Sequence, residues 1–156
     1  VGGLNGPQAA REILRLGTQE LAKELTPDDI KLLRYNLARV AHRGGFSTER
    51  DAHLSAYLQL TNLSAAELEA GRNMRRLTQT IEPRYQRAAI LSLKDALART
   101  DRGVATAQAR YQLADLQRRL GNSASASKNF KDALAHPDCP NELKAMAAFL
   151  LEEIGK

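Results

Sequence analysis

The sequence has little of several residue types on which common folds and sites depend. Its 156 residues include one cysteine, which excludes a disulfide framework and any metal site built on several cysteines. Tryptophan is absent, and the four tyrosines and three phenylalanines are too few for a platform that stacks single-stranded nucleic acid. No apolar run approaches the roughly 20 residues that span a membrane. We therefore expect a soluble protein, and we place it in the cytoplasm.

The sequence also lacks the common motifs of catalysis and cofactor binding. It has no glycine-rich phosphate loop followed by lysine and no HExxH pair. Its three histidines do not have the spacing of metal ligands. Asp28 and Asp29 resemble paired carboxylates, but their position at a predicted helix start explains them more simply. We expect no catalytic residue, no metal and no cofactor, and hence a protein that is not an enzyme.

Positive charge is concentrated in the middle of the chain. The net charge is +5, and residues 70–119 hold 11 basic and 4 acidic residues. Such a segment could face nucleic acid or another polyanion. The alternative is that these bases are solvated side chains on the outer faces of helices.

Apolar residues recur at helical spacing along nearly the whole chain, and no segment shows the period-two alternation of a strand. The fold class we predict is therefore all-α, with about eight helices. The predicted N-caps are Thr26, Ser47 or Thr48, and Ser64, each directly before a helix. The other predicted helices begin near Pro7, at Pro83, near Ala105, near Ser123, and at Pro140-Asn141. We expect a flexible tail over residues 1–6 and a single domain over residues 7–156.

Two internal similarities suggest a repeat of about 37 residues. Residues 91–103 and 128–140 share six of 13 identities at a separation of 37. Residues 35–45 and 111–121 share five of 11 identities at a separation of 76, close to twice that period. We predict repeat-like helix pairs at about 27–63, 64–103 and 104–139, followed by a C-terminal helix at 140–155.

The strongest unit, residues 108–138, resembles a tetratricopeptide repeat. Leu113 and Ala114 match the leucine and small residue of the first helix, and Gly121 matches the glycine that ends it. The second helix has the alanine, aromatic and alanine pattern at its expected spacing, in the order Ala126, Phe130 and Ala133. The first pair matches more weakly, through Leu37, Ala38 and Gly45, and the central pair matches only in its second helix.

This resemblance implies a right-handed stack of antiparallel helical hairpins, an α-solenoid, whose first helices line a concave groove that binds peptides. It implies a non-catalytic interaction module. Carried over position by position, the groove residues are Tyr35, Arg39, His42, Arg43, Gln108, Tyr111, Asp115, Arg118 and Arg119. Because arginine binds carboxylates with a bidentate fork, an acidic peptide would suit these positions. Alternatively, the arginines pair with neighbours such as Asp115 or lie in solvent.

Three functions follow as hypotheses. The first is an adaptor or scaffold that binds a peptide or a partner helix in this groove. The second is binding of nucleic acid or another polyanion through residues 70–119. The third is oligomerisation or assembly within a larger protein, because the helix at 140–155 is apolar enough to contact a second copy. A cap on the helical stack is the other role open to that helix.

Overall fold

The structure is a computed structural model that describes residues 6–156, and these residues are helical with no strand. The all-α prediction is confirmed. The predicted tail lies mostly outside the described residues, because only Gly6 of it is described and Gly6 already begins the first helix. The helices are α1 (Gly6–Leu21), α2 (Pro27–Gly44), α3 (Ser47–Leu58), α4 (Ala65–Arg76), the π-helical segment η1 (Leu77–Ile81), α5 (Glu82–Arg99), α6 (Val104–Arg119), α7 (Ser123–Ala135) and α8 (Asn141–Ile154).

The prediction that Pro83 begins a new helix was wrong. The helix of α4 continues through η1 into α5 without a turn, so residues 65–99 form one helical segment and the described chain has seven separate segments. Proline has no N–H to donate and its ring clashes with the carbonyl four residues earlier. The π-helical turn accommodates this, because the Glu82 N–H donates five residues back to the Leu77 carbonyl. Residues 64–103 are therefore not a helix pair.

Several predicted helix boundaries are confirmed by their capping geometry. The Thr26 hydroxyl accepts a hydrogen bond from the Asp29 N–H at 3.1 Å, directly before α2. Ser64 and Glu67 form a complete capping box at the start of α4. Gly45 ends α2 in the left-handed region, with φ of 75°.

The predicted cap of α3 was wrong. Neither Ser47 nor Thr48 precedes the helix, because Phe46 occupies the N-cap position and makes no side-chain cap bond. The Phe46 ring is buried instead, and the Arg11 guanidinium lies 4.1 Å from its centroid. A packing interaction with α1 therefore sets the entry to α3.

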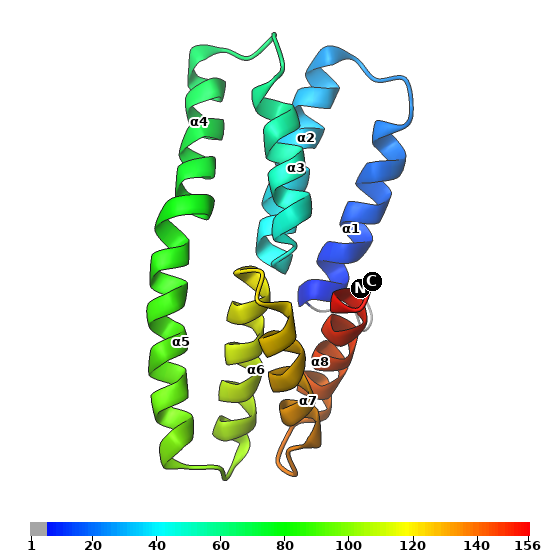
Figure 1. Ribbon diagram of the computed structural model, residues 1–156. Coiled ribbons are helices and arrows are strands. Elements are labelled where there is room, and N and C mark those ends of the chain that lie inside the picture. The colour runs from blue at the N-terminus through cyan, green and yellow to red at the C-terminus, as the bar shows by residue number, and fades with distance from the viewer. Residues whose placement is uncertain (1–5) are drawn as a thin grey trace. The chain divides into compact units, whose positions relative to one another are not determined.

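We expected one domain over residues 7–156, and the contacts of the chain divide it into two compact units, Val1–Glu82 and Pro83–Lys156. In the first unit, α2 packs against α1 and α3, and α3 packs against α4 (Figure 1). Leu14, Leu37 and Leu54 are almost completely buried there. Gly17 permits the close approach of α1 and α2, since a Cβ at this position would lie 2.3 Å from a Leu37 methyl carbon.

In the second unit, α6, α7 and α8 pack against one another. Their shared core consists of fully buried side chains from all three helices, namely Ala114, Ala126, Phe130, Ala147 and Leu150. Phe149, Leu151 and Ile154 of α8 pack against this core, and α8 exposes no large apolar side chain. In contrast, α5 has a single buried residue, Ile90.

The loop before α6 and the loop before α8 are joined by hydrogen bonds. The Gly103 N–H donates to the Asp138 carboxylate at 2.9 Å. His136 is buried, and its Nδ1 accepts from the Asp138 N–H, so its Nε2 carries the proton and donates to the Asp101 carbonyl at 3.2 Å. Cys139 is buried in the second of these loops.

The second helix of the strong unit does not have a structural equivalent in α5, despite their sequence similarity. Ala126, Phe130 and Ala133 are completely buried. At a separation of 37, their counterparts Ala89 and Leu93 are half-buried and Ala96 is exposed. No helix of the described residues is long and apolar enough to cross a membrane.

This difference in burial predicts a difference in stability. We expect Phe130→Ala to lower the free energy of unfolding by about 3–5 kcal/mol, because it removes a fully buried ring and leaves a cavity in the core. Leu93→Ala, at the equivalent repeat position, should lower the free energy of unfolding by about 1 kcal/mol or less. The Leu93 side chain is only half-buried, so its removal loses less hydrophobic stabilisation. Urea denaturation of both variants measures this, and equal losses would contradict the packing described here.

Candidate functional site

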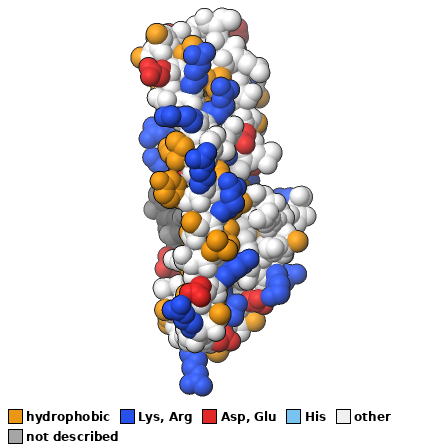
Figure 2. Space-filling model, turned by 60° about the vertical axis from the view of Figure 1, so that its left-hand side comes forward, with side chains coloured by type: hydrophobic (Ala, Val, Ile, Leu, Met, Phe, Trp, Pro, Cys, Tyr) orange, Lys and Arg blue, Asp and Glu red, His pale blue; other side chains and the backbone are white. Residues whose placement is uncertain are grey.

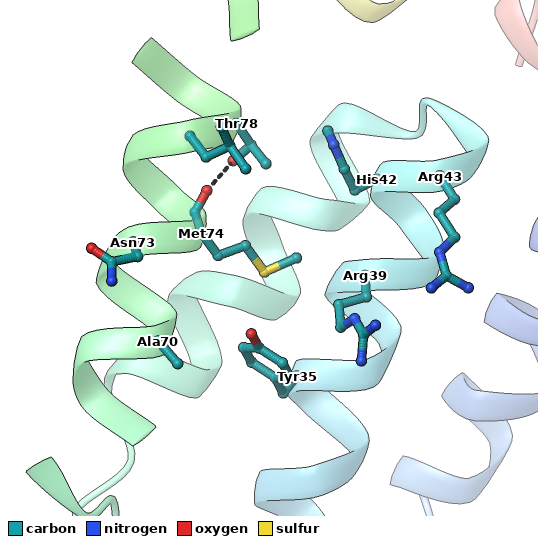
Figure 3. A pocket seen from close by; sticks show the side chains of 9 residues that line it. Tyr35, Arg39, His42, Arg43, Ala70, Asn73, Met74 and Thr78 are labelled. Atoms are coloured by element: carbon teal, nitrogen blue, oxygen red, sulfur yellow. Dashed lines mark hydrogen bonds between the residues drawn. The ribbon is translucent and has the colours of Figure 1, made fainter. Parts of the chain in front are cut away.

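A groove of about 480 Å³ lies between α2 and α4 in the first unit (Figure 3). We call it the α2–α4 groove. Its lining comes from one face of α2 and from the facing side of α4 and η1, namely Tyr35, Arg39, His42, Arg43, Ala70, Asn73, Met74, Leu77 and Thr78. Four of the predicted groove residues, Tyr35, Arg39, His42 and Arg43, are thus brought together here.

The periodicity of α2 explains why these side chains share a face. Residues three or four apart in a helix lie on the same side, as Tyr35, Arg39 and Arg43 do. The opposite positions, Leu37 and Ala41, are buried in the core of the unit. Burial of one face of α2 therefore turns the arginine-bearing face toward the groove.

The floor of the groove is apolar and well supported. The rings of Tyr35 and Tyr57 pack with centroids 5.2 Å apart. Tyr35 and Met74 both rest on the buried cluster that contains Ala38 and Leu54. The Tyr57 hydroxyl donates to the Glu67 carbonyl at 3.0 Å, which fixes the tyrosine pair against α4. Burial raises the pKa of Tyr57, so its hydroxyl remains a donor.

Three polar side chains of the groove have donors that meet no acceptor within the described residues. Arg39 and Asn73 are exposed, and within the described residues their side chains make no hydrogen bond or ion pair. The Tyr35 hydroxyl likewise has no partner within residues 6–156. No aspartate or glutamate lines the groove. The groove therefore offers cationic and neutral donors above an apolar floor.

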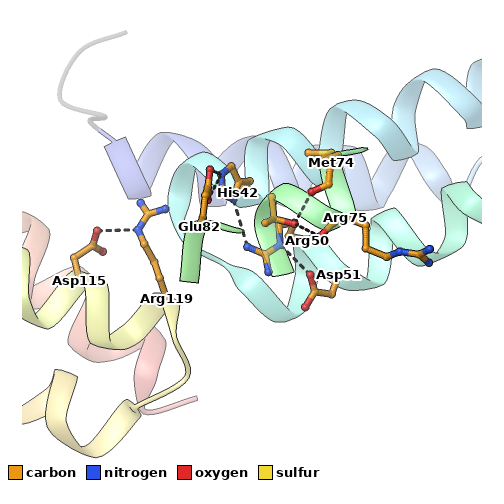
Figure 4. A network of polar contacts seen from close by, with 9 residues as sticks. His42, Arg50, Asp51, Met74, Arg75, Glu82, Asp115 and Arg119 are labelled. Atoms are coloured by element: carbon orange, nitrogen blue, oxygen red, sulfur yellow. Dashed lines mark hydrogen bonds and ion pairs between the residues drawn. The ribbon is translucent and has the colours of Figure 1, made fainter. Parts of the chain in front are cut away.

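His42 lies at the end of the groove and is held by two charged residues (Figure 4). Its Nδ1 lies 3.3 Å from the Arg50 guanidinium, which can only donate, so Nδ1 accepts. Its Nε2 then carries the proton and lies 3.0 Å from the Glu82 carboxylate. Arg50 in turn pairs with Asp51 at 2.9 Å. These contacts tie the histidine ring of α2 to α3 and to the first residue of α5.

The remaining predicted residues lie in the second unit. Tyr111 and Asp115 line a pocket of about 560 Å³ together with Ala89, Ser92 and Leu93 of α5. The Tyr111 ring packs edge-on against Phe130, and its hydroxyl lies 3.9 Å from the Met146 sulfur. Gln108 is exposed on α6 and lines none of the pockets described here.

Arg118 and Arg119 pair with the acid that precedes them on α6. The Asp115 carboxylate lies 2.7 Å from Arg118. It also lies 2.9 Å from Arg119, and Figure 4 shows this second pair. The Arg118 side chain is only 8% exposed. The alternative interpretation of these two arginines, that they pair with Asp115, is therefore confirmed. The sequence reasoning missed Asn73, Met74, Leu77 and Thr78, although their spacing from Ala70 follows one face of a helix.

The other side chains considered for chemistry have structural roles. Within residues 6–156, no group of three or more histidine, cysteine, aspartate or glutamate side chains could hold a metal ion. His53 is buried and its Nδ1 lies 3.1 Å from Arg34, and desolvation and this neighbouring charge lower its pKa. Burial raises the pKa of Cys139, which keeps its thiol protonated.

Comparisons with protein families, with curated proteins and with solved structures find no match to this chain. The geometry of the groove and the chemistry of its side chains are therefore the basis on which function can be argued.

The Tyr111 phenol provides a test of packing in the second unit. Burial raises its pKa to about 12, above the value of about 10 in an unfolded chain. The folded protein therefore binds this proton more tightly, and the associated stability is complete below pH 10 and is lost as the pH rises toward 12. Between pH 10 and 12 we expect the wild type to lose up to about 2 kcal/mol of its free energy of unfolding. Tyr111→Phe should not show this loss, because phenylalanine has no proton to release. Urea denaturation across this range measures it, and identical pH profiles would show that Tyr111 is not buried.

Proposed function

We propose that the chain is a non-catalytic interaction module that binds an acidic peptide, or an acidic partner helix, in the α2–α4 groove. The observation that carries this proposal is the set of unpaired donors, Arg39, Asn73 and Tyr35, above an apolar floor with no carboxylate in the lining. Buried or bound carboxylates require such donors, and the apolar floor offers contact area for a neighbouring side chain. The protein would then act as an adaptor or scaffold.

The organisation of the helices supports a tetratricopeptide-like fold for this module. The residues that carry the family resemblance, Leu113, Ala114, Ala126, Phe130 and Ala133, are all buried. Gly121 has φ of 84° at the end of α6, as the repeat requires. The packing of α8 on both α6 and α7 is what a following first helix, or a capping helix, would do. We propose on these grounds that α6–α7 is one repeat hairpin and α2–α3 another.

The size and polarity of the groove define the ligand class. A volume of about 480 Å³ holds a few side chains rather than a whole domain. One carboxylate can face Arg39 while an apolar side chain lies against Tyr35 and Met74. The second residue pair, Arg118 and Arg119, contributes less to this function, because both guanidinium groups already pair with Asp115.

Selection from a random peptide library tests the proposal. We expect the selected peptides to share an acidic residue next to an apolar one. Arg39→Glu should weaken their binding at least tenfold, because a charge-assisted hydrogen bond contributes roughly 1.5–3 kcal/mol and the new carboxylate repels the ligand. Fluorescence anisotropy with a labelled selected peptide measures the affinity.

The matched control is Arg102→Glu, which makes the same change of charge at an exposed arginine outside the groove. It should leave the affinity unchanged. Equal weakening by Arg102→Glu, or a selection that yields no specific peptide, would contradict the proposal.

Polyanion binding is a second candidate, favoured by a separate observation. Five arginines on α4 and α5 are exposed and have no side-chain hydrogen bond or ion pair within the described residues, namely Arg72, Arg75, Arg76, Arg84 and Arg87. Figure 2 shows Lys and Arg side chains exposed at the surface of the chain. Unpaired arginines at positions i, i+3 and i+4 of α4 repel one another, which costs helix stability unless a polyanion neutralises them.

Salt-dependent binding to duplex DNA tests this candidate. Each phosphate contact releases condensed counterions, so the logarithm of the affinity should fall linearly with the logarithm of the salt concentration. We expect Arg84→Gln/Arg87→Gln to reduce that slope by about 2. No retention on duplex DNA at about 50 mM salt would remove nucleic acid as the partner.

A further inference from the structure

A second pocket, with a different chemistry, lies among α5, α6 and α7 of the second unit. Its volume is about 400 Å³. Each of the three helices contributes one cationic side chain to it, Lys94 from α5, Arg110 from α6 and Lys128 from α7. Leu97 and Leu113 provide its apolar surface. Three consecutive helices thus bring three positive charges to one concave surface.

The acids near this pocket pair with only two of those three cations. Lys94 is exposed and makes no ion pair within the described part of the chain. Arg110 pairs with Asp101 at 3.1 Å, and Lys128 pairs with Asp132 at 3.1 Å. Neither acid lines the pocket, and Asp101 is 72% exposed, so such pairs are weak in water. The pocket therefore retains a net positive charge.

The Gln117 amide supplies independent evidence for an acceptor in this pocket. The Asn129 amide nitrogen donates to the Ser125 carbonyl at 3.1 Å, which identifies that atom as the nitrogen. The same nitrogen donates to Gln117 at 2.7 Å, so the Gln117 atom it meets must be the carbonyl oxygen. The Gln117 NH₂ group is left with no acceptor among residues 6–156, although Gln117 is only 4% exposed and lines the pocket.

We propose that this pocket binds a small oxyanion, a phosphate ester or a polycarboxylate. Its oxygens would accept from the Gln117 NH₂ group and pair with Lys94, Arg110 and Lys128. The Gln117 NH₂ group has an unused donor in this pocket, and an anionic oxygen would accept from it. The volume suits a small molecule. No aromatic side chain lines the pocket, so a nucleobase would find no ring to stack on. The site is separate from the α2–α4 groove and does not depend on peptide binding there.

Titration with inorganic pyrophosphate and, separately, with citrate tests the proposal by ¹⁵N NMR at constant ionic strength. We expect a saturable shift of the Gln117 side-chain NH₂ signals with at least one of the two anions. Tighter binding of pyrophosphate would assign the site to phosphate esters, and tighter binding of citrate would assign it to polycarboxylates. Lys94→Gln should weaken binding on the order of tenfold, because it removes one charge-assisted contact.

Gln117→Glu is the sharper variant. The glutamate keeps an acceptor for Asn129 and the shape of the side chain, but it replaces the donor by a negative charge. We expect it to abolish anion binding while the circular dichroism spectrum stays that of the wild type. If Gln117→Glu does not fold, Lys94→Gln alone decides, because Lys94 is exposed and its loss leaves no core residue unpaired.

Lys131→Gln is the matched control, since it removes one lysine charge from an exposed position of α7 outside the pocket. It should leave the affinity unchanged. Equal weakening by Lys131→Gln and Lys94→Gln would show diffuse attraction to a basic protein and would overturn the proposal. The absence of any saturable shift of the Gln117 signals with both anions would overturn it as well.

Discussion

The missing N–H of Pro83 is the constraint on which the middle of this chain depends. A proline inside a helix deprives an earlier carbonyl of its donor and collides with the preceding turn. Here the helix widens by one residue over η1, and the Glu82 N–H reaches the Leu77 carbonyl. Because the widened turn is still helical, the backbone continues from α4 into α5 where a loop was expected. Leu77 and Thr78 of that turn complete one end of the α2–α4 groove.

The position of acids on a helix decides which arginines are available to a ligand. Arg118 and Arg119 follow Asp115 by three and four residues, so one carboxylate reaches both guanidinium groups. Arg39 has no acid three or four residues away on α2, and its guanidinium has no partner within the described residues. Two arginine-bearing surfaces that look alike by motif therefore differ in what they can bind.

Local signals in the sequence predicted much of the fold. Thr26, Ser64 and Gly45 act through hydrogen bonds and backbone angles within a few residues, so their roles can be read without tertiary information. The Phe130 pattern predicted a buried core because its spacing matches one face of α7. The N-cap at Phe46 could not be predicted in this way, because it depends on a packing contact with Arg11 on another helix.

The candidate site was predicted in part for the same reason. One face of α2 follows from periodicity, and so do Tyr35, Arg39 and Arg43. The other wall of the groove could not be assigned, because the expected turn at Pro83 obscured how far α4 extends. The similarity between residues 91–103 and 128–140 also misled, since a generic helix sequence such as KDALA suits both a buried and an exposed helix.

The loop that joins α7 to α8 contains the protein's one cysteine, and the reactivity of this thiol reports on local opening of the loop. Cys139 is 6% exposed, and its thiol is protonated, so an alkylating reagent reaches a reactive thiolate only when the loop opens. The His136 and Asp138 hydrogen bonds must break for that opening to occur. The rate of alkylation in the native protein therefore reports the free energy of this local event, separately from global unfolding.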